Sequence, residues 1–192
     1  MIQLTKPLIL ASNSPRRKQI LEDAGFTFQV LVKPTEEDFP DSMPPIEVAK
    51  FLSLKKANAF ENEIETNIVL TADTIVVVEN KILNKPTDPE DAFRMLRLLS
   101  GKTHKVITGV SIVTKEDSQS FTDTTLVTFE NLSDWEIKFY LNNFKPYDKA
   151  GSYGVQDFVG MIGIPKIEGS YFTVMGLPIH KVYQHLKKYI IQ

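Results

Sequence analysis

The sequence predicts an α/β fold in which a mixed sheet carries helices on its faces. Two observations support this. Short apolar segments typical of strands alternate with amphipathic segments typical of helices along most of the chain, and strand-like segments then cluster toward the C-terminal end. No repeat or long Gly/Ser linker divides the chain, so its 192 residues are expected to form a single domain over 1–192.

The first predicted elements form a strand and a helix. The apolar run Leu8–Ala11 is a strand, and Ser14 is the expected N-cap of a helix with Pro15 at its first position and a stop at Gly25. A strand over 28–32, an acidic loop over 34–45 and a helix over 46–60 follow. Apolar residues then predict two strands, 68–72 and 75–78, on either side of Asp73-Thr74.

The second half continues the alternation. We expect a turn at 79–81, a short strand ending at Lys85-Pro86, a helix from Asp88 to about Gly101, a strand over 105–114 and another over 126–130. Ser133 and Glu136 have capping-box spacing and predict a helix that ends by Asn143. Residues 150–175 are rich in glycine and aromatic residues and are expected to form strands and loops, and 178–189 a closing helix.

The overall charge limits the possible partners. A net charge of −2 and a pI near 6.0 argue against a general nucleic-acid or anionic-membrane binder, which usually carries a basic surplus. The chain has no cysteine, which excludes disulfides and thiolate metal sites. No apolar run is long enough for a membrane span or resembles a secretion signal, so we expect a cytoplasmic protein without nucleic-acid or membrane partners.

The start of the first predicted helix carries an unusual charge. The first turn of a helix exposes N–H groups and the positive end of the dipole, and it therefore favours acidic residues. Here it contains Arg16, Arg17 and Lys18. The helix that starts after Asp88 has the expected acidic residues, Glu90 and Asp91, and so serves as an internal comparison. A bound anion such as a phosphate would explain the cationic start, and a solvated helix start with paired arginines is the alternative.

Asp73 is the most informative acidic residue, because it interrupts an apolar stretch in which a carboxylate needs a partner, a metal or water. At a strand end beside Thr74 it could bind a magnesium ion or act as a general base, or it could simply cap a turn. Glu37 lies in an acidic triplet that could supply a second metal ligand or be a solvated loop. Lys56 could be only the wet face of a helix, and Lys85 is a weak candidate for a phosphate contact.

A glycine-flanked segment, Gly151–Gln156, forms a second candidate site. Its turn would direct the neutral Gln156 amide, which offers one acceptor and two donors, toward the edge of a base. The alternative is an ordinary turn whose glutamine lies on the surface. The three histidines lack metal-ligand spacing and are interpreted as structural or surface residues.

Taken together, the motifs resemble the Maf family of nucleoside triphosphate pyrophosphatases over nearly the whole chain. The matching segments are Leu10–Arg17, Ala72–Val76, Lys85-Pro86, Leu98–His104, Asp148–Gly151, Gly169–Tyr171 and Gly176–Pro178. The segment Tyr153–Gln156 is similar to the branch that prefers dTTP and UTP. Thr71 departs from the pattern, since many relatives have glycine there.

The resemblance implies an elongated α/β fold of the Maf/ITPase type with a central nucleotide-binding cleft, a homodimer, and metal-dependent hydrolysis of dTTP and UTP to the monophosphate and pyrophosphate. Asp73 would be the proton acceptor, and Asp73 with Glu37 would hold Mg²⁺ or Mn²⁺. The residues implied in substrate binding are Ser12, Ser14, Arg16, Arg17, Lys56, Thr74, Lys85 and Gln156. Nucleotide-pool cleansing, cell-division arrest or both would be the cellular role. The alternative is a non-catalytic, nucleotide-binding regulator of cell division.

Overall fold

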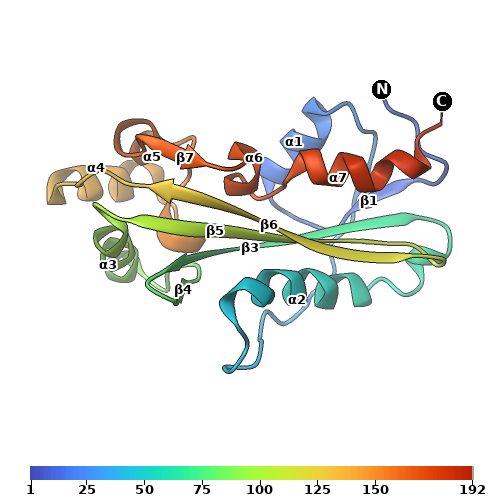
Figure 1. Ribbon diagram of the computed structural model, residues 1–192, viewed down its shortest axis with the longest axis horizontal. Helices are drawn as coiled ribbons and strands as arrows, with labels where there is room; N and C mark the ends of the chain where they lie inside the picture. The colour runs from blue at the N-terminus through green and yellow to red at the C-terminus, as the bar shows by residue number, and fades with distance from the viewer. Residues whose placement is uncertain (192) are drawn as a thin grey trace. The chain divides into compact units, whose positions relative to one another are not determined.

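The computed structural model describes residues 1–191 and shows a mixed α/β fold built on a seven-stranded sheet. The strand order is β2-β1-β3-β5-β6-β7, and β4 also pairs with β3 (Figure 1). The strands are β1 (Leu8–Leu10), β2 (Gln29–Val30), β3 (Ile68–Val78), β4 (Lys81–Leu83), β5 (Thr103–Val113), β6 (Ser118–Thr128) and β7 (Lys166–Glu168). The predicted fold class, a mixed sheet with helices on its faces, is confirmed.

The described part of the chain contains seven α-helices, of which the last two follow β7. They are α1 (Pro15–Asp23), α2 (Pro45–Asn58), α3 (Pro89–Leu99), α4 (Asp134–Phe144), α5 (Phe158–Gly163), α6 (Tyr171–Val174) and α7 (Ile179–Leu186). Short 3₁₀ turns occur at η1 (Glu63–Glu65), η2 (Ala150–Ser152) and η3 (Lys187–Tyr189). None of the described helices is long and apolar enough to cross a membrane.

The chain divides into two compact units. Unit 1 comprises 1–73, 108–123 and 176–192, and unit 2 comprises 74–107 and 124–175. The long strands β3, β5 and β6 therefore contribute residues to both units. The prediction of one domain over 1–192 and the predicted elongated shape with a central cleft stay predictions.

Unit 1 contains the parallel part of the sheet. Strand β1 pairs in parallel with β2 and β3, and α1 connects β1 to β2. The register places Leu10 opposite Leu70. Helices α1 and α7 lie on one side of these strands and α2 lies on the other (Figure 1). Because β1 and β3 are parallel, the residues that follow Leu10 and those that follow Leu70 lie at the same edge.

Unit 2 has its own apolar core. Helix α3 packs against α4, and α4 packs against α5. Fully buried Leu96, Val127, Ile137 and Tyr140 lie at the centre of this core. Strands β3 and β4 are joined by a two-residue turn, Glu79-Asn80, in which both residues have positive φ. That turn type matches the twist of a hairpin and tolerates asparagine well, and it confirms the turn predicted at this place.

The structure corrects several predicted boundaries. Residues 68–78 form one continuous strand, so Asp73 and Thr74 lie inside β3 and not in a turn between two strands. Strand β2 has only two residues, whereas β6 begins at Ser118, well before the predicted strand at 126. Residues 150–175 include helices α5 and α6, although strands and loops were expected there. The continuous β3 and the early start of β6 depend on pairing with other strands, which local sequence does not reveal.

Candidate active site

The cationic start of α1 is built as the sequence predicts. Ser14 is the N-cap and its side chain accepts a hydrogen bond from the Arg17 N–H at 3.5 Å, while Pro15 opens the helix. No acidic residue lies in the first turn. Because β1 is followed directly by this loop, the helix start lies at the carboxyl edge of the parallel strands, where α/β folds commonly bind ligands.

Two contacts fix the Arg17 side chain in place. Its Nη1 donates to the Ser12 hydroxyl at 3.1 Å, and its Nε donates to the Gly176 carbonyl at 2.8 Å. The Ser12 hydroxyl also accepts from the Ser14 N–H at 3.2 Å. Burial lowers the pKa of the Arg17 guanidinium, and the nearby Asp73 carboxylate opposes that shift. Since arginine stays protonated in proteins, Arg17 is an oriented cation, and the two serines orient it and shape the loop.

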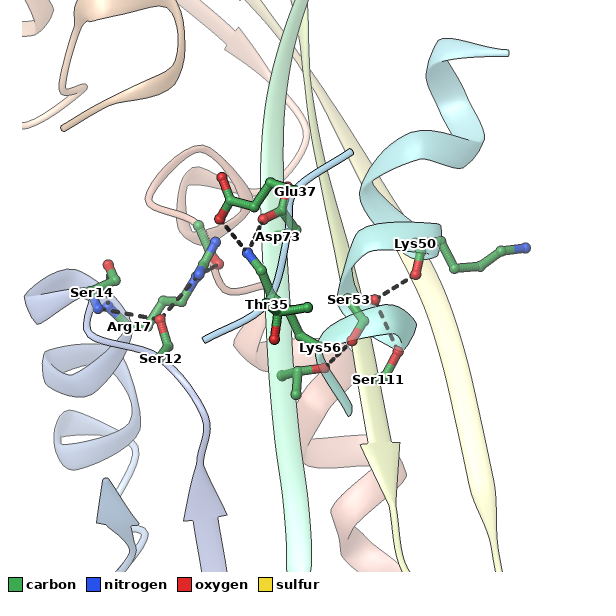
Figure 2. Close-up of polar contacts among 12 residues, drawn as sticks. Ser12, Ser14, Arg17, Thr35, Glu37, Lys50, Ser53, Lys56, Asp73 and Ser111 are labelled. Atoms are coloured by element: carbon green, nitrogen blue, oxygen red, sulfur yellow. Dashed lines mark hydrogen bonds and ion pairs between the residues drawn. The ribbon is translucent and has the colours of Figure 1, made fainter. Parts of the chain in front are cut away.

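Asp73 is paired with a lysine on α2. The Lys56 ammonium lies 2.5 Å from Asp73 Oδ1 and 2.8 Å from Glu37 Oε1 (Figure 2). The side chains of Asp73 and Lys56 are only 13% and 19% exposed, whereas Glu37 is 48% exposed. An ion pair with hydrogen bonds is what a nearly buried carboxylate requires. Lys56 is therefore part of a charged cluster, and its interpretation as only the wet face of a helix is wrong.

Alternation along the strand explains why Asp73 meets α2. Thr71 and Asp73 are two residues apart in β3 and therefore point to the same face. Thr71 Oγ1 donates to the Ser53 carbonyl of α2 at 2.6 Å, and Ser53 is one helical turn before Lys56. Thr74 follows Asp73 in the strand and points to the opposite face. The expectation that Asp73 stands at a strand end beside Thr74 is thus wrong.

Sequence reasoning missed the residues that seat α2 on the sheet. The Ser53 hydroxyl bonds the Ser111 hydroxyl at 2.9 Å, and Ser111 bonds Ser120 at 2.8 Å (Ser53 and Ser111 in Figure 2). A Cβ on Gly109 would lie 2.2 Å from the Ala49 carbonyl carbon, so only glycine allows this close approach. A glycine within a β-branched strand can signal close backbone contact, and it was the available signal here.

The acidic loop before α2 is fixed by the same helix. Lys55 forms an ion pair with Asp38, and Lys56 forms one with Glu37. Lys56 also contacts Asp73, so Glu37 and Asp73, the two candidate metal ligands, are held next to each other. No group of three or more His, Cys, Asp or Glu residues suited to a metal occurs within residues 1–191. Two carboxylates nevertheless fit Mg²⁺ or Mn²⁺, since such ions often bind one or two carboxylates and complete their shell with water and substrate phosphates.

Arg16 is half-buried in the first turn of α1 in unit 1, whereas Thr74, Lys85 and Gln156 belong to unit 2. Lys85 follows β4 and is exposed. Gln156 is also exposed and lies in a turn between η2 and α5, as the glycine-flanked segment suggested. The structure therefore brings together Ser12, Ser14, Arg17, Glu37, Lys56 and Asp73 within unit 1. The roles assigned to all ten candidate residues stay predictions.

Comparisons with known proteins agree with the motifs. The family model described as Maf-like protein matches residues 7–189. A dTTP/UTP pyrophosphatase from Flavobacterium johnsoniae is 48% identical over 180 residues, which cover 93% of each chain. A protein with the same name from Phocaeicola vulgatus is 47% identical over 94% of this chain and 95% of its own. Another, from Porphyromonas gingivalis, is 45% identical over 95% of this chain and 94% of its own. The extent of these matches shows that the chain belongs to the Maf family.

Proposed function

We propose that this protein hydrolyses dTTP and UTP between the α and β phosphates, giving the nucleoside monophosphate and pyrophosphate. One structural observation carries the proposal: a nearly buried carboxylate, Asp73, lies in a charged cluster with Lys56, Glu37 and the oriented Arg17. The proteins curated as dTTP/UTP pyrophosphatases that resemble it at 44–48% identity support the substrate assignment.

Asp73 would activate the water. As the water oxygen bonds to phosphorus and the α–β bridge breaks, a proton passes from the water to an Asp73 carboxylate oxygen and the departing phosphate oxygen takes the negative charge. The carboxylates of Asp73 and Glu37 would hold a divalent cation. When bound, that cation supplies Lewis acidity toward the phosphate oxygens.

The basic residues would neutralise the triphosphate. Arg17 is already oriented by Ser12 and Gly176, so little rotamer freedom is lost when it forms a bidentate contact with phosphate. Arg16 and Lys85 would add positive charge. The Lys56 ammonium, which contacts both carboxylates in the structure, would supply further positive charge to the phosphate oxygens.

A non-catalytic nucleotide-binding regulator is not favoured, because the curated relatives are named as pyrophosphatases and Asp73, with a carboxylate that could accept a proton, lies beside Lys56 and Glu37. A homodimer and a cytoplasmic location, with a role in nucleotide-pool cleansing, division arrest or both, complete the proposal as expectations drawn from the family.

A direct assay tests the proposal. Purified protein is incubated with dTTP, UTP, CTP, GTP and 7-methyl-GTP, with and without Mg²⁺ or Mn²⁺, and the products are separated by chromatography. We expect dTMP or UMP and pyrophosphate in the presence of metal, with dTTP and UTP consumed fastest. Release of a nucleoside diphosphate and phosphate, or no hydrolysis of any nucleotide, would contradict the proposed reaction.

A further inference from the structure

The turn that carries Gln156 is closed and rigidly supported within unit 2. The Asp157 N–H donates to the Gly154 carbonyl at 3.0 Å, which closes a four-residue turn with Gln156 at its third position. Val155 is buried, whereas Gln156 is exposed. No hydrogen bond to the Gln156 amide is observed within residues 1–191. The turn thus presents an amide whose donors and acceptor can bind an external group.

A single buried hydroxyl links both ends of this turn. Tyr140 of α4 is fully buried, and its hydroxyl accepts from the Gly154 N–H at 3.0 Å and donates to Asp157 Oδ2 at 2.7 Å. Burial and the Asp157 carboxylate raise the pKa of Tyr140 above its ordinary value, so the hydroxyl keeps its proton. The Lys149 ammonium lies 3.7 Å from the same Asp157 oxygen and balances its charge.

The packing around the turn leaves little freedom for rearrangement. A Cβ on Gly154 would lie 2.5 Å from Asp157 Oδ2, and a Cβ on Gly160 would lie 2.1 Å from the Val155 carbonyl oxygen. The turn is therefore in close contact with the carboxylate on one side and with α5 on the other. Its conformation is set before any ligand arrives, which lowers the entropy cost of binding.

We propose that Tyr140 is a positioning residue for base selection, because its hydroxyl holds both ends of the turn that presents the Gln156 amide to a pyrimidine base. This inference rests on the proposed function. Without the hydroxyl, the Gly154 N–H and the Asp157 carboxylate each lose a partner, and Gln156 samples more orientations. Contacts to the triphosphate do not depend on this hydroxyl. Removing it should therefore reduce the preference for pyrimidine bases and leave triphosphate binding unchanged.

The experiment compares Tyr140→Phe with Thr114→Val. Thr114 is also buried, and its hydroxyl accepts from the Asp117 N–H at 3.1 Å in the turn between β5 and β6 of unit 1. Both variants lose one buried hydroxyl, so both are expected to lose some stability. We expect Tyr140→Phe to reduce the ratio of kcat/KM for dTTP to that for GTP roughly 3- to 10-fold, mainly through KM for dTTP. Thr114→Val should keep the wild-type ratio, and an equal change in both variants, or equal losses on dTTP and GTP, would overturn the inference.

Two further measurements separate this inference from the proposed reaction. Binding of α,β-methylene-dTTP and α,β-methylene-GTP, measured by calorimetry, reports base preference without turnover. A wild-type protein that hydrolyses nothing but prefers the thymidine analogue, with the preference reduced in Tyr140→Phe, would contradict the pyrophosphatase proposal and support the positioning role. A wild-type protein without base preference would overturn the positioning role. In the Gln156→Ala background, Tyr140→Phe should leave the remaining ratio unchanged, and an additive effect would contradict its action through Gln156.

Discussion

The charged cluster of unit 1 and the Gln156 turn of unit 2 differ in the kind of side chain they contain. In the first, ionised side chains meet each other: Lys56 lies between Asp73 and Glu37, and Arg17 is fixed by a hydroxyl and a carbonyl. In the second, a neutral amide stands on a turn that a buried tyrosine hydroxyl supports.

This difference matches the two parts of a nucleotide. A triphosphate is the same anion in every nucleotide, so charges that act on it should affect all substrates alike. Bases differ in the placement of hydrogen-bond donors and acceptors, which a neutral amide can distinguish. Damage to the cluster should therefore reduce turnover uniformly, and damage to the turn should change the preference among bases.

The largest effect is expected from Asp73→Asn. An amide cannot accept the proton from water, so pyrophosphate release should fall roughly 100- to 10,000-fold on every nucleotide. Nucleotide binding, measured by calorimetry, should largely remain. Asp123→Asn is the matched control, since Asp123 is 12% exposed in β6 and pairs with Lys181 at 2.6 Å. Near-normal turnover in Asp73→Asn would remove this residue from the mechanism.

Acid should weaken the neutral core of unit 2. His104 is buried beside Tyr153, and burial lowers its pKa to about 4. In the unfolded chain the His104 imidazole has a pKa of about 6.5. Between about pH 6.5 and about pH 4 the imidazole is therefore protonated in the unfolded chain but neutral in the folded one. The free energy of unfolding thus falls as the pH drops from about 6.5 to about 4. His104 alone should contribute roughly 3 kcal/mol of this loss.

Urea unfolding at several pH values tests this contribution. The wild-type protein should lose more stability over this range than His104→Gln does, whereas His180→Gln, at an exposed position, should follow the wild type. Parallel curves for wild type and His104→Gln would show that His104 does not resist protonation.

Arg17→Ala should reduce kcat/KM roughly 10- to 100-fold on all nucleotides, as expected for the loss of a charged hydrogen-bonding group. Arg17→Lys should recover only part of this loss, because one ammonium cannot replace a bidentate guanidinium. Arg94→Ala, on the exposed face of α3, is the control. Unchanged activity together with a more stable α1 would mean that the arginines are only an unfavourable helix start.

The smallest effect is expected from Gln156→Ala. Loss of one neutral hydrogen bond should lower kcat/KM for dTTP and UTP roughly 2- to 10-fold while the slow hydrolysis of GTP changes little. Gln19→Ala, an exposed glutamine on α1, controls for the loss of a surface amide. A uniform loss across all bases would mark Gln156 as a scaffold residue and erase the contrast between the two regions.

Local features of the fold could be read from the sequence because their causes lie within a few residues. The Ser14, Asp88 and Ser133 caps and the Glu79-Asn80 turn depend on neighbouring backbone groups, and all four are present in the structure. Family membership was likewise readable from ordered motifs.

Tertiary structure decided the features whose partners are distant in the chain. Asp73 looked like a break in a strand, yet the strand continues through it because Lys56, on another element, neutralises the carboxylate. The polar start of β6 gave no alternating pattern, and its strand conformation comes from pairing with β5. Tyr140 of α4 supports the Gln156 turn by hydrogen bonds to residues that precede α5. Such contacts join residues that no local propensity connects, so only the folded chain could reveal them.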